Sequence, residues 1–467
     1  MRALRLLALA CAAMLALLVP AAAGPAAGER VLIATDLHFN PMADPALVDR
    51  LAAADPSAWP AILDGAPDRS LGRYGADTTW PLLRSAVRAM KMVVPDPAFV
   101  LLPGDFLAHG FRRQFDAVAH RHTNANYRTF VRKTMQFVTG RIARAFPGRP
   151  ILLTLGNNDS GCGDYQLAPH GRFLAATLPL VRRLLGRAGG AGIAPSWAGY
   201  GNYSVVLPRP PGVRVLVLNT VFFSAHYRNR CGAPGEADPG RATLAWLGRR
   251  LAAAKAAGAK VWLLYHIPPG ADAYATFRSG FCPDAFVPLW KPAYAKPFAA
   301  LMRRYAGTIA ASFAGHLHMD DFRLTGAGGS PAGFVLITPA VSPIFGQNPA
   351  FRTVSFDGAG RLRDETTYDL TNLTNAGAGT PAAWQAEYTF TRAWHLPRLD
   401  TASLARLVRM IAQKPAVRRQ WVRFYGVSSP ITALALAAPI GHPARAVLCA
   451  PAHLTPQDYN RCYCGGD

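Results

Sequence analysis

Acidic residues are scarce in this sequence: 27 Asp and Glu face 50 Lys and Arg, which gives a formal net charge of +23. The imbalance disfavours cationic partners and favours anionic ones, such as phosphate esters, acidic lipid headgroups, the bacterial envelope or nucleic acid. A genomic interpretation stands beside this one, because abundant Ala, Arg, Gly and Pro are typical of a GC-rich genome that replaces Lys by Arg. The composition leaves both interpretations open.

Several familiar patterns are missing as well. The chain has no RRM, helix-turn-helix or zinc-finger pattern, so we expect no specific nucleic-acid recognition. It has no internal repeat and no low-complexity tract, which excludes a repeat architecture. What it does have is length: 467 residues, 51% of them hydrophobic, are enough for one large domain and a smaller one.

A long hydrophobic run lies at the start of the sequence. Two arginines precede an apolar stretch from Leu6 to Val19, and three alanines follow it. This order is typical of a secretory signal peptide, with cleavage after Ala23 or Ala27. We therefore predict a signal peptide in residues 1–27 and a periplasmic or secreted protein, with an uncleaved anchor as the alternative.

The seven cysteines are few, but an even number remains in the predicted exported part. Removal of the signal peptide takes Cys11 away and leaves six, which suggests disulfides. Cys231 and Cys282 flank His266 and could pair, Cys162 stands apart, and the other three crowd the C-terminus. The pattern does not determine the connectivity, and free thiols are compatible with it.

Strand-like and helix-like segments alternate over the first three quarters of the chain. Apolar, strand-like runs end where polar residues begin, and helical spacing fills several of the intervals. The strand-like runs that precede these polar residues are 31–35, 99–102, 151–155, 261–265 and 309–313. This alternation predicts a layered α/β domain with its functional residues at the carboxyl ends of strands.

The pattern changes after Asp369. Residues 371–425 carry helical periodicity, and a cysteine-bearing tail follows them. We therefore predict a main domain over residues 28–370 and a small helical, cysteine-containing subdomain over residues 371–467.

Five short polar segments carry the chemistry of this sequence. Each one follows a strand-like apolar run, with Pro103 intervening before the second. They are Asp36-Leu37-His38, Gly104-Asp105, Gly156-Asn157-Asn158-Asp159, Tyr265-His266 and Gly315-His316-Leu317-His318. From them, the carboxylates of Asp36 and Asp105, the amide oxygen of Asn157 and four imidazoles form the ligand inventory of two hydrolytic divalent ions that share a bridging carboxylate.

The ligands divide into two sets. One ion would take Asp36, His38 and His318. The other would take Asn157, His266 and His316, and Asp105 would bridge the two ions. In an extended segment residues i and i+2 point the same way, so the Asp-x-His and His-x-His pairs can each aim both side chains into one cleft. Glycines at positions 104, 156 and 315 permit turns that a Cβ would hinder.

The i, i+2 spacing by itself is weak evidence for a metal site. His120 and His122 show the same spacing, but they lie in an Arg-rich stretch of helical periodicity over residues 111–145, so we interpret them as surface residues. The five segments are more specific, because they occur together, in order, and mostly at strand ends.

At these residues the chain resembles the calcineurin-like metallophosphoesterases, whose motif is D-x-H, G-D, G-N-H, H and G-H-x-H. Within that superfamily it is similar to the acid sphingomyelinase-like phosphodiesterases. The narrower resemblance rests on Tyr74-Gly75, Pro81-Leu82-Leu83, His266-Ile267-Pro268-Pro269-Gly270, Thr338-Pro339, Ser342-Pro343, Asn348-Pro349-Ala350-Phe351-Arg352, Trp384-Gln385-Ala386-Glu387-Tyr388, Arg419-Gln420-Trp421 and Phe424-Tyr425. It covers most of residues 31–467.

The resemblance implies a fold, a cofactor and a catalytic residue. The fold is a β-sandwich of two mixed sheets flanked by helices, with a catalytic domain over residues 28–370 and a helical C-terminal subdomain. The ions are zinc in the subfamily, although the ligand set alone also admits Mn, Fe or Co. A disulfide between Cys449 and Cys462 is implied as well. His109 matches a family histidine that protonates the leaving oxygen or stabilises charge beside the phosphate, with a loop histidine of no role as the alternative.

Two departures from the family pattern matter. The second residue after Gly156 is usually a histidine that assists acid catalysis, and here it is Asn158, whose amide can donate a hydrogen bond but cannot transfer a proton. Either His109 acts alone as the acid, or Asn158 orients the phosphate. Animal sphingomyelinases also carry a saposin-like domain before the catalytic domain. No such segment precedes the first strand here, so we expect a soluble or exposed phosphodiester as substrate.

The leading hypothesis is an exported dinuclear-metal phosphodiesterase of sphingomyelinase-like type. A polyphosphate or nucleotide phosphohydrolase on the same site is the nearest alternative, which the Arg excess and the likeness of the GNND segment to endopolyphosphatases favour. A non-catalytic envelope-binding protein is a third hypothesis, which the intact ligand set opposes. The expected partner of an enzyme here is an anionic phosphoester (a lipid headgroup, a nucleotide or polyphosphate), and peripheral contact with the envelope or a membrane is compatible with the basic surface.

Overall fold

The computed structural model describes residues 29–190, 192–231, 238–327, 330–377, 379–438 and 442–465. The predicted signal peptide at residues 1–27 lies outside them, and so does Cys11. Among the helices of the described residues, none combines the length and the apolar character needed to span a bilayer.

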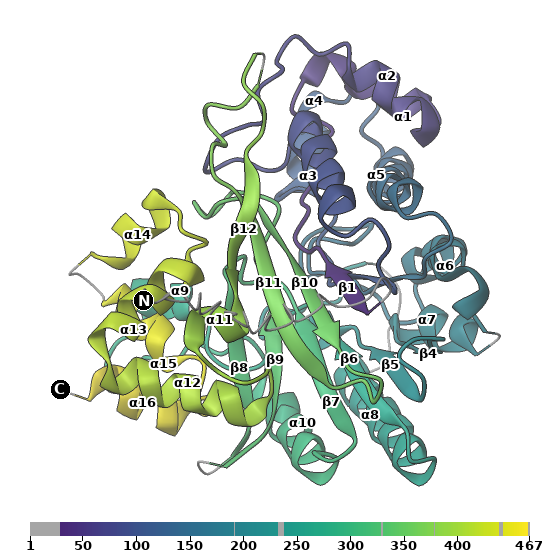
Figure 1. Ribbon diagram of the computed structural model, residues 1–467. Coiled ribbons are helices and arrows are strands. Elements are labelled where there is room, and N and C mark those ends of the chain that lie inside the picture. Colours follow the sequence, from purple (N-terminus) through teal and green to yellow (C-terminus); the bar gives the residue numbers. More distant parts are fainter. Residues whose placement is uncertain are drawn as a thin grey trace, which may run out of the picture.

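Two six-stranded mixed sheets form the centre of the molecule (Figure 1). The first has the strand order β12 (Trp384–Thr389), β11 (Leu362–Leu370), β10 (Ala350–Phe356), β1 (Arg30–Ile33), β2 (Val100–Leu102) and β3 (Ile151–Leu153). The second has the order β4 (Tyr203–Val206), β5 (Val213–Val217), β6 (Lys260–Leu264), β7 (Ile309–Ala314), β9 (Ser330–Ile337) and β8 (Asp321–Ala327). The predicted sandwich of two mixed sheets is confirmed.

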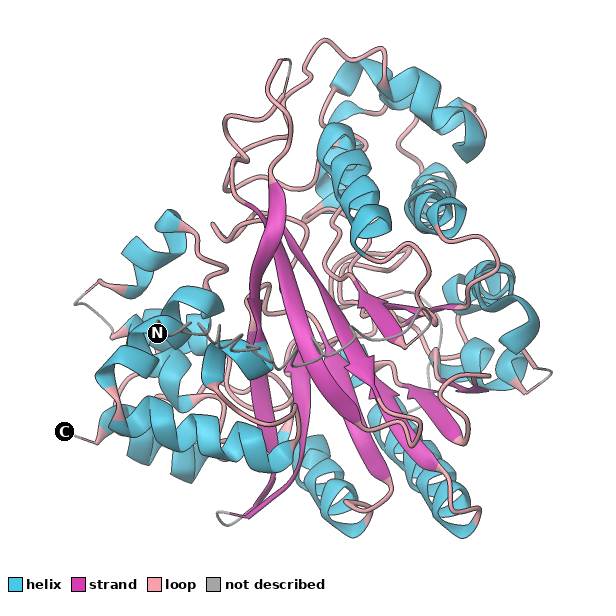
Figure 2. Cartoon of the chain, in the orientation of Figure 1, coloured by secondary structure: helices cyan, strands magenta, loops and turns pink. Residues whose placement is uncertain are grey.

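Helices flank the two sheets on several sides (Figure 2). On the side of the first sheet that carries β1, β2 and β3 lie α1 (Val48–Ala53), α2 (Trp59–Leu63), α3 (Trp80–Val93), α4 (Phe111–Val118), α5 (Asn124–Ala145) and α6 (Arg172–Leu185). The next helix, α7 (Ile193–Tyr200), contacts α6 and the edge strand β4 of the second sheet. The second sheet is covered by α8 (Pro239–Ala256) and α10 (Pro292–Arg304). The remaining helices gather at the left of Figure 1 and are α9 (Ala273–Ser279), α11 (Phe390–Trp394), α12 (Thr401–Gln413), α13 (Pro415–Tyr425), α14 (Pro430–Leu436), α15 (Pro443–Cys449) and α16 (Pro456–Cys464).

The central strands are short apolar runs because both of their faces are covered. β2 reads Val-Leu-Leu and β3 reads Ile-Leu-Leu, and every residue of both is buried. Parallel strands covered on both faces have no polar side to alternate with, so their sequences are continuously hydrophobic. Because these strands are continuously apolar, the first polar residues after them mark the strand ends in the sequence.

The space between the two sheets is filled by an aromatic cluster around Trp262 of β6. Its ring centroid lies 5.7 Å from that of Phe99, 5.4 Å from that of Phe313 and 5.7 Å from that of Phe356. The indole N–H donates to Gly360 O at 2.8 Å, which satisfies its polar atom inside the core. Residues from both sheets therefore share one core, which holds the sheets in a defined relation.

One expected helical segment is a strand. Residues 384–389 carry part of the helical periodicity seen after Asp369, yet they form β12 and pair antiparallel with β11. In so short a segment, the spacing of apolar residues fits a helix and a strand equally well. A strand can pair with the free edge of β11, whose backbone groups a helix would leave unpaired. The first sheet therefore extends into the predicted C-terminal subdomain, and the boundary near residue 370 stays a prediction.

Three disulfides join the six cysteines outside the predicted signal peptide. They are Cys162–Cys231, Cys282–Cys464 and Cys449–Cys462. The pair implied by the resemblance is present, whereas the suggested pairing of Cys231 with Cys282 is wrong. Backbone contacts explain the difference: Arg228 N donates to Tyr165 O at 3.1 Å, so the segment before Cys231 runs beside the loop that carries Cys162.

A buried ionic network links the C-terminal half of the chain to the loop after β7. The Arg352 guanidinium, which has no exposed surface, pairs with Asp320 and lies 3.2 Å from Glu365. Asp320 also accepts hydrogen bonds from Thr367 Oγ1 at 2.6 Å and from Tyr388 Oη at 3.0 Å. Charges so deeply buried are costly unless they are paired, so the network depends on the single cation.

The Arg352→Ala variant should lose about 3–5 kcal/mol of unfolding free energy, because Asp320 and Glu365 would stay buried without their cation. Urea unfolding followed by tryptophan fluorescence measures this loss. Arg361→Ala is the matched control, since Arg361 is mostly exposed and pairs with Asp357 at the surface, so that variant should barely change stability. Equal, small losses in both variants would show that the network is not needed.

Candidate metal centre

The predicted ligands follow the carboxyl ends of five strands. Asp36 and His38 follow β1, Asp105 follows β2, Asn157 follows β3, His266 follows β6, and His316 and His318 follow β7. β1, β2 and β3 are parallel neighbours in one sheet, and β6 and β7 are parallel neighbours in the other. Backbone hydrogen bonds join the loops, for example from Asp36 N to Gly104 O at 3.0 Å. The structure therefore brings all seven side chains to one edge of the sandwich.

The first cluster consists of Asp36, His38 and His318. His38 Nε2 lies 3.1 Å from His318 Nε2 and 3.7 Å from Asp36 Oδ1. His318 Nε2 lies 3.5 Å from the same carboxylate oxygen. Three donor atoms thus face one another within the range that a single cation can span.

The second cluster consists of Asn157, His266 and His316. His266 Nε2 lies 3.1 Å from Asn157 Oδ1. A ligand atom of His316 lies within 4.8 Å of ligand atoms on His266 and Asp105. The structure thus brings the members of each predicted set together, and their assignment as metal ligands stays a prediction.

Asp105 lies between the clusters. Its Oδ2 atom is 3.5 Å from His38 Nε2 in the first cluster and 3.3 Å from His266 Nε2 in the second. Its side chain is almost completely buried. One carboxylate oxygen therefore faces both clusters, which is the geometry of a bridging ligand.

Hydrogen bonds on the outer side of the ligands aim their donor atoms inward. His38 Nδ1 donates to Leu107 O and His266 Nδ1 donates to Pro103 O, each at 2.8 Å. Asn157 Nδ2 donates to Asp164 Oδ1 at 2.8 Å, so its amide oxygen faces His266. With one ring nitrogen committed to a carbonyl, the Nε2 lone pair of each imidazole is available to a metal.

The backbone of the site is strained at the ligands themselves. Five of the seven have left-handed backbone angles: Asp36 (φ 49°), His38 (φ 35°), Asp105 (φ 55°), His316 (φ 76°) and His318 (φ 64°). Such angles cost free energy in residues with a Cβ and persist where the surrounding fold enforces them. We expected an extended backbone to make the Asp-x-His and His-x-His side chains converge, and this expectation is wrong. Tight turns with left-handed backbone angles direct these side chains toward one another.

Gly156 and Gly315 are required for close packing and not for a positive φ. A Cβ at Gly156 would fall on the Asp105 carboxylate, and a Cβ at Gly315 would fall on the side chains of Thr35 and Asp36. Gly104 has a positive φ of 106°, and a Cβ there would lie 2.6 Å from Gly156 N. Glycine is needed because the loops approach the ligands as closely as backbone allows.

The donor set fits two divalent cations. The two buried carboxylates, Asp36 and Asp105, create a negative field at the clusters. Although burial alone would lower the pKa of His38, the charge of Asp105 and the hydrogen bond to Asp36 raise it to about 10. The pKa of His266 is likewise raised to about 9 by Asp105 against the effect of burial. The site thus attracts positive charge, and neutral imidazoles with carboxylates and an amide oxygen suit transition-metal ions.

His109 lies beside the first cluster and keeps 31% of its side chain exposed. Its ring stacks on that of His38 with centroids 4.0 Å apart. Its Nδ1 lies 3.0 Å from Asp77 Oδ1, and its backbone N–H donates to Asp77 Oδ2 at 2.8 Å. Since an ionised carboxylate only accepts, Nδ1 carries the proton and the Nε2 atom is left for another partner.

Asp77 is well placed to remain ionised beside this histidine. Burial alone would raise its pKa, but the hydrogen bond to His109 and the charges of His38 and His109 hold the pKa below its ordinary value. Ser342 Oγ also donates to Asp77 Oδ1 at 3.1 Å. The carboxylate therefore fixes both the orientation and the tautomer of the imidazole.

Asn158 points at the bridging carboxylate. Its backbone N–H donates to Asp105 Oδ1 at 2.8 Å, and its side-chain amide donates to Asp105 Oδ2 at 2.9 Å. These two contacts orient the Asp105 carboxylate, and the expected role of Asn158 in orienting the phosphate stays a prediction.

Three carboxylates were missed by the sequence interpretation: Asp77, Asp159 and Asp164. Asp159 is buried and accepts hydrogen bonds from the backbone N–H groups of Asp105, Phe106 and Gly156 at 2.8 to 2.9 Å. It belongs to the GNND segment, so its position was a usable signal. Asp77 had no such sequence signal, apart from its position two residues after Tyr74-Gly75.

A cavity of about 280 Å³ opens onto the two clusters. Asp105, His109, Asn157, His316 and His318 form its polar floor. Its walls are largely apolar and come from α9, the loop at Phe345, and the C-terminal helices, with Phe277, Met319, Phe345, Leu436 and Val447 among the lining residues. Phe345 stands edge-on to His318, with ring centroids 4.6 Å apart.

His120 and His122, which share the spacing of the predicted ligand pairs, lie outside the site. His120 is 89% exposed and contacts Asp49 at the surface, between α4 and α5. His122 lies in the same connection, with its Nδ1 atom 3.2 Å from Ala119 O. The interpretation of both as surface residues is confirmed, although they occupy a loop and not a helix.

No family model matches the chain. By sequence, the chain is similar to the acid sphingomyelinase-like phosphodiesterase 3b of Mus musculus, at 28% identity over 416 residues that span 84% of this chain and 82% of that protein. The Homo sapiens protein of the same name is 29% identical over 426 residues, with the same coverage. The cyclic GMP-AMP phosphodiesterase SMPDL3A of Mus musculus is 27% identical over 419 residues, which span 87% of this chain and 85% of that protein.

Among solved structures, a dimetal phosphatase from Danio rerio matches 76% of this chain and 98% of its own, at 13% identity and a TM-score of 0.44. The sequence similarity to the acid sphingomyelinase-like phosphodiesterases covers more than four fifths of the chain and confirms the resemblance first indicated by short motifs.

The His266→Ala variant should retain about one bound metal ion per chain where the parent protein holds about two, because the second cluster loses its central donor. Elemental analysis of purified, metal-reconstituted protein measures the ratio. His120→Ala is the matched control, since it removes a histidine of similar spacing from the surface. Equal metal content in all three proteins would contradict the assignment of the second cluster.

Proposed function

We propose that this chain, which is similar over more than four fifths of its length to acid sphingomyelinase-like phosphodiesterases, is a metal-dependent phosphodiesterase that acts at the two clusters around Asp105. The observation that carries this proposal is the position of Asp105 Oδ2 between His38 Nε2 and His266 Nε2. A buried carboxylate shared by two imidazole-containing donor sets is suited to hydrolysis of a phosphoester and serves no evident structural need.

Zinc is the metal we propose for both clusters. Asp36, His38 and His318 would hold one ion, Asn157, His266 and His316 the other, and Asp105 would contact both. Bound there, two such ions supply a Lewis acid for the phosphoryl oxygens and lower the pKa of water. The imidazole-rich donor set, with no thiolate, supports zinc and is also compatible with manganese or iron.

His109 is the residue we propose to protonate the leaving oxygen. It lines the cavity beside the first cluster and its Nε2 atom is not committed to Asp77. Its partial exposure lets it exchange protons with solvent between turnovers. Asp77 acts as a positioning residue, because its two contacts hold the imidazole of His109 against His38.

Asn158 supports the bridging carboxylate and takes no part in proton transfer. Both of its donor groups bind Asp105, one to each carboxylate oxygen. An amide keeps this contact at every physiological pH, which a histidine at the same position would not. His109 is then the sole acid.

A phosphodiester substrate is supported by the relatives, which are named as acid sphingomyelinase-like phosphodiesterases and as a cyclic GMP-AMP phosphodiesterase. Hydrolysis of polyphosphate or nucleotides at the same site is the second candidate, and the high positive charge favours it. We further propose export by cleavage of residues 1–27 to the periplasm or outside the cell, where the three disulfides would be stable.

A substrate panel tests the function directly. Purified protein of measured metal content is assayed on bis-nitrophenyl phosphate, sphingomyelin micelles, cyclic dinucleotide, nucleoside triphosphate and polyphosphate. Diesters should turn over and the metal-free protein should be inactive. Activity on triphosphate and polyphosphate alone would establish the second candidate, and inactivity on every substrate at full metal content would contradict both.

The His109→Ala variant should lose about 10²–10⁴-fold in kcat on diesters with alkyl leaving groups and much less on nitrophenyl esters, because only a poor leaving group needs a proton. Steady-state rates on the two substrate types measure the contrast. Equal losses on both would remove His109 from the acid role.

Asp77→Asn should reproduce the same contrast at smaller amplitude, because the imidazole remains but loses its partner. In the His109→Ala background the Asp77→Asn change should have almost no further effect, since the two residues act as a unit. Additive losses in the double variant would show that Asp77 acts elsewhere.

A further inference from the structure

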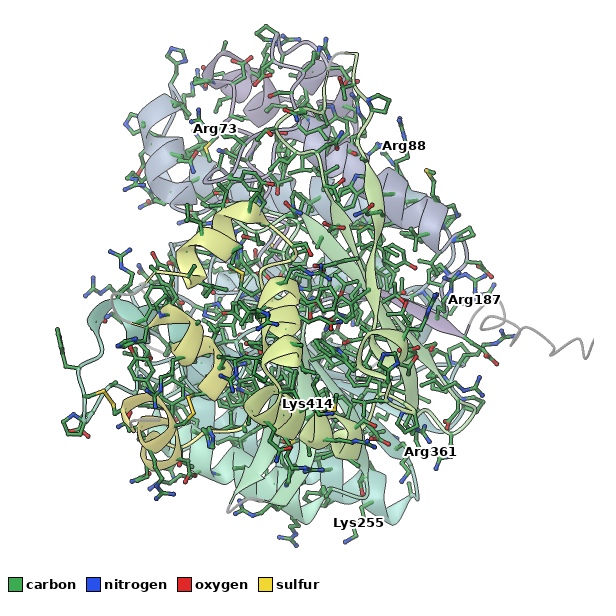
Figure 3. The ribbon with its side chains drawn as sticks, turned by 60° about the vertical axis from the view of Figure 1, so that its left-hand side comes forward. Arg73, Arg88, Arg187, Lys255, Arg361 and Lys414 are labelled. Carbon is green, nitrogen blue, oxygen red and sulfur yellow. A yellow bond between two sulfur atoms is a disulfide. The ribbon has the colours of Figure 1, made fainter. Side chains whose placement is uncertain are left out.

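The cavity at the metal centre differs in charge from the rest of the chain. The chain as a whole has a formal net charge of +23. Figure 3 shows cations on several sides of the molecule, with labels on Arg73, Arg88, Arg187, Lys255, Arg361 and Lys414. Yet none of the described residues that line the cavity is Lys or Arg. A substrate inside the cavity therefore meets no guanidinium or ammonium group among these lining residues.

The charged side chains that do line the cavity are carboxylates. Asp105 belongs to its polar floor, and Asp164 and Asp272 are the further acidic residues of its lining. Asp164 Oδ1 accepts a hydrogen bond from Asn157 Nδ2 at 2.8 Å, so its charge lies beside the second cluster. Asp272 comes directly before α9. Within the described structure, no hydrogen bond or ion pair joins it to any of the seven predicted ligands, so its carboxylate is not needed to hold them.

Tyr165 shows that these carboxylates act on one space. Burial raises the pKa of its hydroxyl well above the ordinary value, and the charges of Asp164, Asp105 and Asp272 raise it further. Since charges influence a pKa only from nearby, all three carboxylates lie around the same hydroxyl. The Tyr165 ring stands edge-on to that of His316, with centroids 6.3 Å apart. The field of Asp272 therefore reaches the part of the cavity beside the second cluster.

The helix that follows Asp272 holds its carboxylate in place. Asp272 Oδ1 accepts a hydrogen bond from Ala275 N at 2.8 Å, which caps α9. Burial raises the pKa of Asp272, whereas this hydrogen bond and another from the backbone of Tyr274 lower it and favour the charged form. The buried Arg323 also lowers this pKa, but its guanidinium pairs with Asp321 and does not line the cavity. The charge of Asp272 is therefore not neutralised on the cavity side by a cation of the described residues.

The carboxylates leave little positive charge for a polyanion. Those of Asp36, Asp105, Asp164 and Asp272 together match the charge of the two divalent ions that we propose for the clusters. A phosphodiester brings one negative charge to this balance, whereas a triphosphate or a polyphosphate brings several. Each additional charge would lie near Asp272 without a guanidinium to pair with, and like charges at such separations repel.

We propose that Asp272, together with Asp164, is a specificity-determining residue that makes the cavity select phosphodiesters whose alcohol groups carry no further negative charge. The inference rests on the proposed function and narrows its substrate class. It disfavours nucleoside triphosphates and polyphosphate as substrates, although the net charge of the whole chain attracts such polyanions to the outer surface. The attraction at the surface and the repulsion in the cavity thus act on different parts of the molecule.

The test uses two soluble esters that have the same leaving group and differ in charge. One is the nitrophenyl ester of thymidine monophosphate, a diester with a single negative charge, and the other carries an additional phosphate on the sugar. The metal-loaded parent protein should cleave the first ester with a kcat/KM at least about tenfold higher. In Asp272→Asn this preference should shrink about three- to tenfold, because the side chain keeps its shape and loses its charge. Asparagine is also a good N-cap, so α9 should stay folded.

Two further variants separate the charge of Asp272 from its other properties. Asp272→Glu should keep most of the preference, since it restores the carboxylate. Asp284→Asn is the matched control, because it removes the same charge from the exposed loop after α9, outside the cavity lining, and should leave the preference as it is in the parent protein. Metal content is measured in each protein, which separates a changed preference from a lost ion. Asp164 is left in place because it bonds Asn157.

Binding of the same two esters separates this inference from the proposed function. If neither ester is cleaved at full metal content, the proposed function fails, and titration calorimetry then gives the Kd of each ester. Weaker binding of the more highly charged ester by the parent protein, but not by Asp272→Asn, would still support the role of Asp272. An unchanged ratio of kcat/KM or of Kd in Asp272→Asn would overturn that role, and cleavage of the first ester would then leave the phosphodiesterase intact. A parent protein without preference between the two esters would overturn it as well.

Discussion

The contact between the Asp105 carboxylate and two imidazoles from opposite sheets is the interaction on which the rest of the structure depends. His38 follows the first sheet and His266 follows the second, and both face the same oxygen of Asp105. Asn158 binds both carboxylate oxygens from one side, and Asp159 holds the backbone of Asp105 from another. The aromatic core between the sheets holds the two halves of the site at this distance, so packing far from the metal centre sets its geometry.

The site concentrates strain and close packing where its chemistry requires them. Left-handed backbone at Asp36, Asp105 and His316 turns each side chain into the centre, and glycines at 156 and 315 let the loops come close. Each strained residue costs on the order of 1–3 kcal/mol, and the strands that precede these turns are buried on both faces and absorb that cost. The outer hydrogen bonds of His38 and His266 then present their Nε2 atoms inward, so the geometry is prepared before a metal arrives.

Much of the site could be predicted because each ligand follows a short apolar run, and such runs are readable as strands. The GNND segment was recognisable, but the contact of Asn158 with Asp105 was not, since it depends on how two loops pack. Asp77 was invisible for the same reason: its role comes from lying beside His109, 32 residues away. β12 was misjudged because a short segment can satisfy a helical or a strand pattern, and the open edge of β11 decided between them.

The sequence by itself determined the chemistry: which donors are present, in what order they come, and that they end strands of a layered sheet. It also determined that the surface is basic and that six cysteines remain outside the predicted signal peptide. Only the tertiary structure decided which carboxylate faces both clusters and which cysteines pair. These are relations between segments far apart in the chain, and local pattern carries no information about them, because long-range packing and not residue order sets the distance between two loops.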